Sequence, residues 1–339
     1  MKPRVEVNFD RAERWAFWKK RTDFQSNENK FLLNHARSGL LLALKSLCLP
    51  KGSKVGVMVY NCHTVMNAVA QAGCEVVFID IDDRLRIDRD DLEKKSNVLN
   101  ALIVTHLFGI INDVDAIRSR YPQLPIIEDC AHAFGKEIIA DFGVYSIGQG
   151  KLPSLGDGGI LVVNNEKYVS AVEALYEALS EYSKFDDIKL YSRLLLTHWL
   201  HRKWVYGIFT SRWKQNKKPQ SGRETIVVKK MSRGVRAMFA LRRNDIPNQV
   251  QFRLLKAEKE AETLRNNPLV TNVLIGSNAF MLVVRCTNPT KLKEQYAQKG
   301  IETATHFSNS LFWAREFGYQ GDCKNAERLR NELLMIPVY

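Results

Sequence analysis

Short runs of Val, Ile and Leu alternate with amphipathic stretches from about residue 35 to about residue 165. The apolar runs have the length and the β-branched composition of buried strands, and they lie at 54–59, 75–80, 101–105, 124–128, 143–146 and 159–163. Between them, apolar residues recur at helical spacing over 35–47, 63–72 and 114–121. This alternation predicts an α/β domain with a largely parallel sheet, in which ligands gather at the carboxyl ends of the strands.

The pattern changes after residue 166. A helix is predicted over 169–182, and 185–218 is a basic segment rich in Leu and Trp that we expect to be helical. Beyond the linker-like run NKKPQSG, the sequence predicts a long helix over 234–266 broken near Pro247, strands at 270–275 and 280–285, a helix at 291–299 and two short helices at the end. We therefore predict a large domain over 1–222 and a smaller α+β domain over 223–339.

The composition is that of a folded globular chain, with 45% hydrophobic and 26% charged residues among 339. The six cysteines form no CxxC pair, so we expect small buried residues in a reducing compartment and no metal site. The chain opens without an apolar signal core, and no uncharged run reaches the roughly 18 residues that a membrane span needs. We expect a cytoplasmic protein.

The formal net charge of +13 indicates an anionic partner. Much of the excess lies between residues 200 and 230, where Glu224 is the one acidic residue among many cations. These cations are Arg202, Lys203, Arg212, Lys214, Lys217, Lys218, Arg223, Lys229 and Lys230. Three interpretations stay open: a solvated face, a seat for the diphosphate of a nucleotide-sugar, or a contact with a membrane surface or a protein, as the interleaved Trp204, Tyr206, Phe209 and Trp213 suggest. No recognised motif accompanies the charge, so we expect no nucleic-acid partner.

Two segments are candidates for chemistry, and the first is LPIIEDCAHAFG at 124–135. Its buried strand ends in Glu128 and Asp129 and then turns through small residues past His132. A carboxylate at the buried end of a strand is costly unless it meets a partner. The alternative is that Asp129 only caps the beginning of a helix.

The second segment, YSIGQGKLPSLGDGG at 145–159, places Lys151 in a Gly-containing loop between two strands. A solvated loop lysine is the simplest alternative. A phosphate-binding P-loop is excluded, because Tyr145 stands where the first Gly is required and Leu152 replaces the Ser or Thr.

Together the two segments resemble the DegT-type (DegT/DnrJ/StrS) sugar aminotransferases, which use pyridoxal 5'-phosphate. Ser146, Lys151 and the Gly-rich turn follow Asp129 in the order and spacing of that family. The segments SGLLLALKSL, GCEVVFIDID, THLFG, MS at 231–232, THFSNSLFWAREFGY and AERLRNELLMIPVY resemble its other parts over much of the chain. The resemblance implies the aspartate-aminotransferase fold, with a mostly parallel sheet in the large domain and a smaller α+β C-terminal domain.

The resemblance also implies a role for each matching residue. Lys151 would carry the cofactor as a Schiff base and move protons, and Asp129 would keep its pyridine nitrogen protonated. Ser146 and the backbone amides of Ala36 and Arg37 would bind its phosphate. Further positions expected near the cofactor are Ala131, His132, Cys62 and His63, and those expected near the substrate are His106, Phe108, His306, Lys229 and Lys230.

The chain departs from the family pattern at three places. Relatives usually have Gly-Thr where this chain has Ala36 and Arg37, and an aromatic residue over the cofactor ring where it has Cys62. An Asn that reaches across the dimer in many relatives is replaced by the region of Lys229 and Lys230. A cofactor-binding sensor or scaffold with impaired turnover is therefore the alternative to an enzyme.

The function that the resemblance implies is transamination. An amino-acid donor, expected to be glutamate, would give its amino group to a keto-sugar, expected to be nucleotide-linked and destined for surface polysaccharide, lipopolysaccharide or another glycoconjugate. Some relatives that deoxygenate sugars carry His at the lysine position, so Lys151 favours transamination over sugar dehydration. Relatives are homodimers with both active sites at the interface, so we expect a homodimer.

Overall fold

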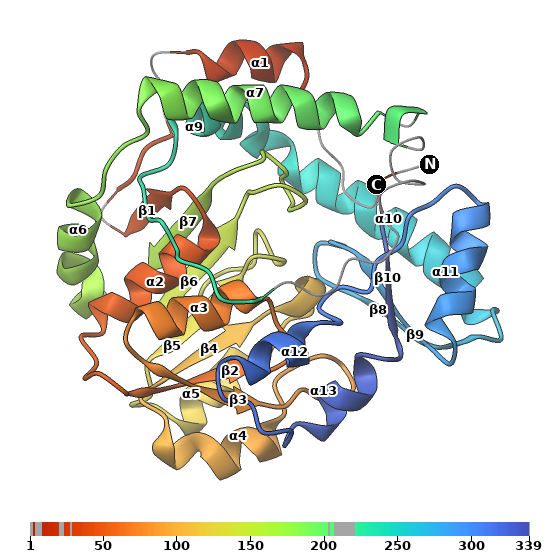
Figure 1. Ribbon diagram of the computed structural model, residues 1–339, viewed down its shortest axis with the longest axis horizontal. Helices are drawn as coiled ribbons and strands as arrows, with labels where there is room; N and C mark the ends of the chain where they lie inside the picture. Colours follow the sequence, from red (N-terminus) through yellow and green to blue (C-terminus); the bar gives the residue numbers. More distant parts are fainter. Residues whose placement is uncertain are drawn as a thin grey trace.

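The computed structural model describes residues 3, 9–19, 24–27, 29–202, 204–206 and 221–338. Their strands form a seven-stranded sheet in the order β1-β7-β6-β5-β4-β2-β3 and a three-stranded sheet in the order β10-β9-β8 (Figure 1). The larger sheet comprises β1 (Lys30–Leu33), β2 (Lys54–Met58), β3 (Glu75–Ile79), β4 (Ala101–Thr105), β5 (Ile126–Cys130), β6 (Phe142–Ser146) and β7 (Gly159–Val163). The smaller comprises β8 (Val270–Ile275), β9 (Leu282–Cys286) and β10 (Leu333–Ile336). The predicted fold class is confirmed.

Strand direction decides where a site can form. The strands β3, β2, β4, β5 and β6 pair in parallel, whereas β7 is antiparallel to β6 and β1 is antiparallel to β7. The carboxyl ends of β2, β4, β5 and β6 therefore lie at one edge of the sheet, where loops from several strands converge.

Helices cover both faces of the larger sheet because alternate strand residues are buried on opposite sides. Ala101 and Ile103 of β4 pack with α2 (Ala36–Ser46), α3 (His63–Gln71) and α6 (Val169–Glu177). Leu102 and Val104 point to the other face, with α4 (Arg89–Lys95), α5 (Val114–Arg120), α12 (Ser310–Arg315) and α13 (Lys324–Leu329). The remaining α-helices among the described residues are α1 (Arg11–Phe17), α7 (Lys184–Leu200), α9 (Arg233–Arg242), α10 (Ile246–Arg265) and α11 (Pro289–Gln298).

The break predicted near Pro247 is observed. The helix α9 ends at Arg242, a short 3-10 turn follows, and α10 begins with Pro247 in its first turn. Proline is tolerated there because the first N–H groups of a helix have no intrahelical acceptor. Of the basic segment 185–218, the part up to 200 belongs to α7, and Lys203 and 207–220 lie outside the described residues.

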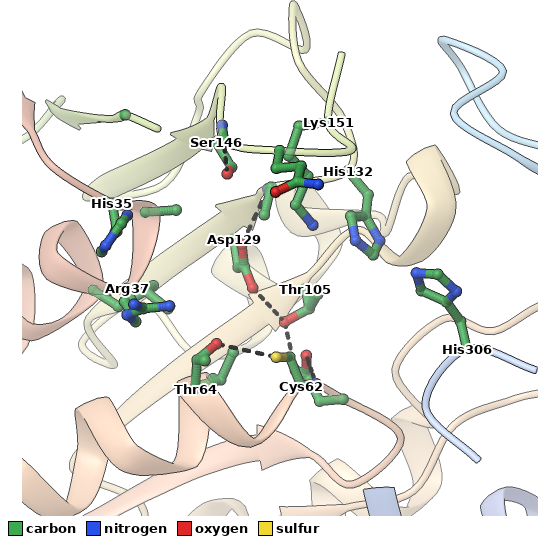
Figure 2. Close-up of a pocket in the computed structure, with 18 of the residues that line it drawn as sticks. His35, Arg37, Cys62, Thr64, Thr105, Asp129, His132, Ser146, Lys151 and His306 are labelled. Atoms are coloured by element: carbon green, nitrogen blue, oxygen red, sulfur yellow. Dashed lines mark hydrogen bonds between the residues drawn. The ribbon is translucent and has the colours of Figure 1, made fainter. Parts of the chain in front are cut away.

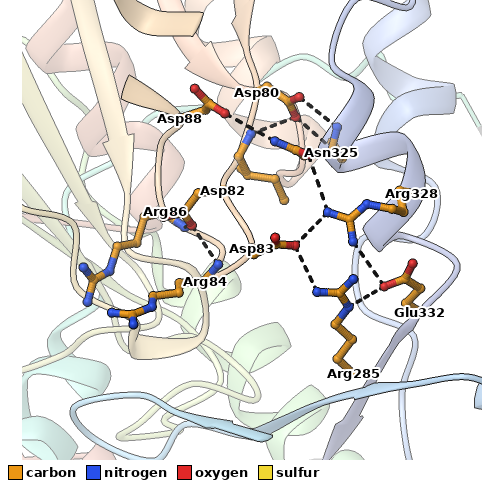
Figure 3. Close-up of polar contacts among 12 residues, drawn as sticks. Asp80, Asp82, Asp83, Arg84, Arg86, Asp88, Arg285, Asn325, Arg328 and Glu332 are labelled. Carbon is orange, nitrogen blue, oxygen red and sulfur yellow. Dashed lines mark hydrogen bonds and ion pairs between the residues drawn. The ribbon is translucent and has the colours of Figure 1, made fainter. Parts of the chain in front are cut away.

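Charged residues tie the C-terminal unit to the large sheet (Figure 3). Arg285 of β9 and Arg328 of α13 both pair with Asp83, at 3.0 and 2.7 Å. Asp80, at the end of β3, accepts the backbone N–H groups of Asn325 and of the residue after it at 2.8 and 2.9 Å, which caps α13.

The segment 223–231, which connects the two units, packs against the large domain. Residues 223–231, which the sequence assigns to the smaller domain, hydrogen-bond to it through Met231 N–H to the Leu32 carbonyl (2.9 Å) and Ile226 N–H to Gln71 (2.8 Å). The domain boundary at residue 222 therefore stays a prediction.

Candidate active site

A cavity of about 480 Å³ opens at the carboxyl ends of β2, β4, β5 and β6 (Figure 2). Its walls come from the beginning of α2, the β2–α3 loop, the ends of β4 to β6, the loop around Lys151, one residue of α7 and the C-terminal unit. The polar lining residues include His35, Arg37, Asn61, Cys62, Thr64, Thr105, Asp129, His132, Ser146, Gln149, Lys151, Arg193 and His306. Segments far apart in the sequence therefore meet in one site.

Asp129 lies at the carboxyl end of β5 and is 4% exposed. Its carboxylate accepts hydrogen bonds from the N–H of Ala131 (3.0 Å) and from the hydroxyl of Thr105 (3.3 Å). Thr105 is itself held by the side-chain amide of Asn61 at 2.8 Å. Burial raises the pKa of Asp129, although these hydrogen bonds and the nearby Lys151 act in the other direction. A cationic partner in the cavity would stabilise its charged form.

Lys151 faces the same cavity from the loop after β6. Burial lowers the pKa of its ammonium group, and the charges of Cys62 and Asp129 oppose that change. Its Nζ lies 5.5 Å from the centre of the Phe280 ring, which belongs to the C-terminal unit. A lysine in such a place loses its proton more readily than a solvated one and can act as a nucleophile.

A set of anion-binding groups lies on the opposite side of the cavity from the small domain. The helix α2 begins at Ala36 with no side-chain cap, so its first N–H groups are free to bind an anion. Arg37, Ser146 and Arg193 also line this part of the cavity. The strand β7 can approach α2 closely because Gly159 has no side chain. A Cβ there would lie 2.3 Å from the carbonyl carbon of His35, which is too close for any other residue.

The sequence analysis assigned no role to His35, Asp157 or Arg193, which lie together in this region. His35 precedes α2, and its Nδ1 lies 2.7 Å from Asp157 of the Gly-rich turn. Asp157 also accepts the hydroxyl of Tyr182 at 2.8 Å and lies 3.8 Å from Arg193 of α7. The GDGG run was visible in the sequence, but nothing in its spacing indicates a partner on a helix some forty residues later.

His132 is an uncharged ring held between aromatic side chains. Its ring stacks on Phe280 at 4.3 Å and on Phe307 at 5.7 Å, between centroids. Burial, with the charges of Lys151 and His306, puts its pKa well below the usual value. The N–H of Phe108 donates to Nδ1 at 3.2 Å, which leaves Nε2 as the protonated nitrogen.

Cys62 carries a polarised thiol at the beginning of α3. Its Sγ accepts the hydroxyl of Thr64 (3.2 Å) and lies 4.0 Å from Nδ1 of His63, whose Nε2 lies 3.8 Å from Glu224. Burial alone would raise the pKa of Cys62, but the contacts with His63 and Thr64 outweigh it and lower that pKa. The same contact raises the pKa of His63. The Cys62 thiol in the cavity wall therefore loses its proton more readily than an ordinary cysteine.

A buried carboxylate network lies directly beneath Asp129. Glu128 accepts hydrogen bonds from His106 (2.9 Å), from Lys136, and from the N–H groups of Ile139 and Ala140 (2.7 and 2.8 Å). Burial alone would raise the pKa of Glu128, but these donors outweigh it and hold the pKa at about 2. The network fixes the strand end that carries Asp129.

One trio of side chains could in principle hold a metal ion. The ligand atoms of His106, Glu128 and Cys130 lie within 4.8 Å of one another. Both oxygens of Glu128 already have two donors each, and His106 is one of these donors. We therefore interpret the trio as a structural network.

The structure brings most of the predicted residues together. Ala36, Arg37, Cys62, Asp129, Ala131, His132, Ser146, Lys151 and His306 line the cavity. His63 stands just outside it, where its ring contacts Trp313.

Four predicted substrate residues are not in this cavity. His106 and Phe108 are completely buried beneath it, in the carboxylate network and in the aromatic stack. Lys229 pairs with Asp186 at 2.9 Å and lies in a neighbouring cavity. Lys230 pairs with the exposed Glu177 at 3.0 Å. Within one copy of the chain, these four side chains do not reach the space where a ligand would lie.

The residues present fit pyridoxal phosphate. The uncapped α2 with Arg37, Ser146 and Arg193 suits a phosphate, and Lys151 and Asp129 provide an amine and a carboxylate in the same cavity. Among the described residues, the Lys151 amine has no hydrogen-bond partner, so it is available to a ligand.

Comparison with known proteins agrees with this geometry. The family model for the DegT/DnrJ/EryC1/StrS aminotransferase family matches residues 13–188. An L-glutamine:2-deoxy-scyllo-inosose aminotransferase of Streptoalloteichus tenebrarius is 27% identical over 190 residues, which are 49% of this chain and 45% of the relative. GDP-perosamine synthase of Escherichia coli O157:H7 is 29% identical over 163 residues, 42% of this chain and 45% of the relative. The matched stretch thus spans less than half the length of these curated relatives.

The fold comparison extends over the whole chain. The E. coli GDP-4-keto-6-deoxy-D-mannose-3-dehydratase with bound hydrated PLP superimposes with a TM-score of 0.75 at 16% identity, covering 100% of this chain and 95% of that one. At this identity the match shows a shared fold.

Proposed function

Because the chain belongs to the DegT/DnrJ/EryC1/StrS aminotransferase family, we propose that it is a pyridoxal-phosphate-dependent aminotransferase acting on a keto-sugar. The observation that carries the proposal is that Lys151 and Asp129 face one cavity whose far side is an uncapped helix N-terminus. An amine, a carboxylate and an anion site in this arrangement match the three chemical parts of the cofactor.

When bound, pyridoxal phosphate supplies an aldehyde that takes up amino groups and a ring that withdraws electrons. Asp129 would hold a proton at the ring nitrogen, and the resulting ion pair would offset the cost of burying its carboxylate. Burial lowers the pKa of Lys151, so its Nζ would take a proton from the substrate carbon and return it more readily than a solvated lysine would. The aromatic side chains around His132 exclude water from this part of the cavity.

The phosphate group would be held by the amides of Ala36 and Arg37, by the Arg37 side chain and by the hydroxyl of Ser146. Arg193 adds a further cation beside Ala36 and Arg37, which stand where relatives usually have Gly-Thr. His35, paired with Asp157, fixes the turn against α2.

The donor and the acceptor would use the cavity in turn. Glutamate is the expected donor, although one relative is named for L-glutamine. A nucleotide-linked keto-sugar is the expected acceptor, in line with the GDP-linked sugar in the name of GDP-perosamine synthase. The basic character of the cavity rim suits a diphosphate. A homodimer in the cytoplasm, working in the synthesis of surface polysaccharide or lipopolysaccharide, completes the proposal.

The test is a turnover assay with glutamate and a panel of nucleotide-linked keto-sugars, read by mass spectrometry of the sugar product. We expect an amino-sugar from the native protein and from the exposed-lysine control Lys94→Ala, and none from Lys151→Ala. Initial rates should give parallel double-reciprocal lines, as expected when both substrates share one site. A product that lacks an oxygen and carries no amino group would identify a dehydratase. Cofactor binding without any sugar product across the panel would favour a sensor or scaffold.

A further inference from the structure

The helix α7 exposes an apolar stripe to solvent. Leu190 and Leu194 face the core, at 5% exposure each. On the outer side Phe185, Ile188, Leu196 and Trp199 are 74%, 53%, 57% and 45% exposed. Their spacing places all four on one side of the helix. The solvent-facing side of a helix is normally polar, so this helix has two apolar sides.

The helix α1 continues the stripe. Its Trp15 and Trp18 are 69% and 52% exposed. The Trp18 ring lies 5.2 Å from that of Tyr191 in α7, and the N–H of Phe9 donates to His198 at 3.2 Å. Figure 1 shows α1 lying along α7 at one edge of the molecule.

Basic residues border the stripe. Lys184, Lys189 and Arg193 of α7 and Arg11 and Lys19 of α1 are exposed. Within α1 and α7 no Asp or Glu is exposed, and Asp10, the exposed residue that caps the beginning of α1, pairs with Arg242 at 3.2 Å.

The carboxylates of these helices are directed elsewhere. Glu13 is 1% exposed and pairs with Arg242, which also pairs with Asp10 at the beginning of α1. Asp186 pairs with Lys229, and Asp187 accepts the hydroxyl of Ser232. The outer side of both helices is thus apolar in the middle and cationic at its borders.

We propose that this side, defined by Trp15, Trp18, Phe185, Ile188, Leu196 and Trp199 and named the α1–α7 face, docks onto an anionic lipid bilayer. Trp and long apolar side chains favour the headgroup region, and flanking Lys and Arg bind anionic headgroups. Among the described residues no helix is long and apolar enough to cross a membrane, so the contact is with the bilayer surface. The proposal is independent of the catalytic one.

A bilayer fits this face better than a second copy of the chain does. A two-fold contact would bring the same patch of both copies together. The basic border of one copy would then lie against the basic border or the apolar stripe of the other. The exposed carboxylate of Asp10 already pairs with Arg242, and the carboxylates of Asp186 and Asp187 are directed to Lys229 and Ser232, so these three carboxylates do not neutralise the borders. An anionic surface neutralises all five cations at once. Arg193 belongs both to the border and to the cavity lining, so a docked molecule would hold its cavity close to the lipid surface.

The test is sedimentation of the full chain with vesicles of phosphatidylcholine alone or with phosphatidylglycerol added. We expect binding to the anionic vesicles that falls as salt rises. Removing apolar residues in Trp15→Ser/Trp18→Ser or Phe185→Ser/Trp199→Ser should weaken it by about tenfold or more. Lys184→Gln/Lys189→Gln should weaken it by about 25-fold, since each cation near the surface contributes about fivefold.

Matched controls carry the same changes elsewhere. Phe312→Ser on α12 removes an exposed aromatic residue (41% exposed), and Lys293→Gln on α11 removes an exposed cation, both away from the α1–α7 face. They should bind like the native protein. The proposal is overturned if the native protein ignores anionic vesicles, or if the face variants bind as the controls do. It is also overturned if the variants change the mass of the protein in solution, measured by light scattering, because the face would then contact a second copy. Circular dichroism confirms that each variant is folded.

Discussion

Replacing Glu128 with Gln should destabilise the protein more than its conservative chemistry suggests. The carboxylate accepts four hydrogen bonds, two from the side chains of His106 and Lys136 and two from backbone N–H groups. An amide has one oxygen to serve these donors, and its NH2 group would face at least one of them. The variant therefore buries an unpaired donor beside a buried cation.

The size of the effect follows from the pKa of Glu128. A pKa held at about 2, against an ordinary value of 4.5, corresponds to about 3 kcal/mol of stabilisation of the charged form. Because the folded-state pKa is lowered, this stabilisation is present above about pH 4.5 and is lost as the pH falls to about 2. For a chain of 339 residues, 3 kcal/mol lowers the melting temperature by about 4 °C.

Differential scanning calorimetry at pH 7 measures this difference, with Glu93→Gln as the control. Glu93 pairs with Arg120 at the surface, where both side chains are more than half exposed, so its loss should change stability by less than about 1 kcal/mol. The gap between native protein and Glu128→Gln should narrow as the pH approaches 2. If Glu128→Gln melts within the range of the control, the buried network does not hold the strand end in the way described.

Two further predictions concern the cavity wall. At pH 7 iodoacetamide should alkylate Cys62 before the more exposed Cys48, because the pKa of Cys62 is lowered. Peptide mass spectrometry measures both reactions, and His63→Gln should slow the alkylation of Cys62. Earlier labelling of Cys48 would contradict the lowered pKa of Cys62. Arg37→Gln should weaken binding of pyridoxal phosphate by about tenfold in a calorimetric titration while leaving pyridoxal, which has no phosphate, unchanged. Equal losses for both compounds would remove Arg37 from the phosphate site.

The central strands could be predicted because each has a continuous apolar run. The strand β4 (Ala101–Thr105) is buried along its whole length, and the sequence predicts its bounds correctly. The strand β1 (Lys30–Leu33) was missed because four residues are too short for a clear pattern, and pairing with β7 stabilises it. The strand β10 (Leu333–Ile336) was missed for the same reason.

The site was predictable where one segment carries its chemistry. Asp129, Ser146 and Lys151 follow each other within the larger sheet, and family spacing identified them. Arg193 and His35 reach the cavity only because α7 and β7 lie beside the beginning of α2, which no local pattern records. The outward apolar side of α7 was visible as unusual composition, but only the structure shows which of its residues are exposed.

The central claim is that Lys151 binds pyridoxal phosphate covalently in this cavity. The most direct test adds the cofactor to native protein, Lys151→Ala and the Lys94→Ala control, records the visible spectrum, reduces with borohydride and maps the modified peptide by mass spectrometry. We expect a visible band that borohydride removes, and a cofactor mass on the peptide containing Lys151, in the native protein and in Lys94→Ala but not in Lys151→Ala. No band at saturating cofactor, or a stable adduct on another lysine, would contradict it.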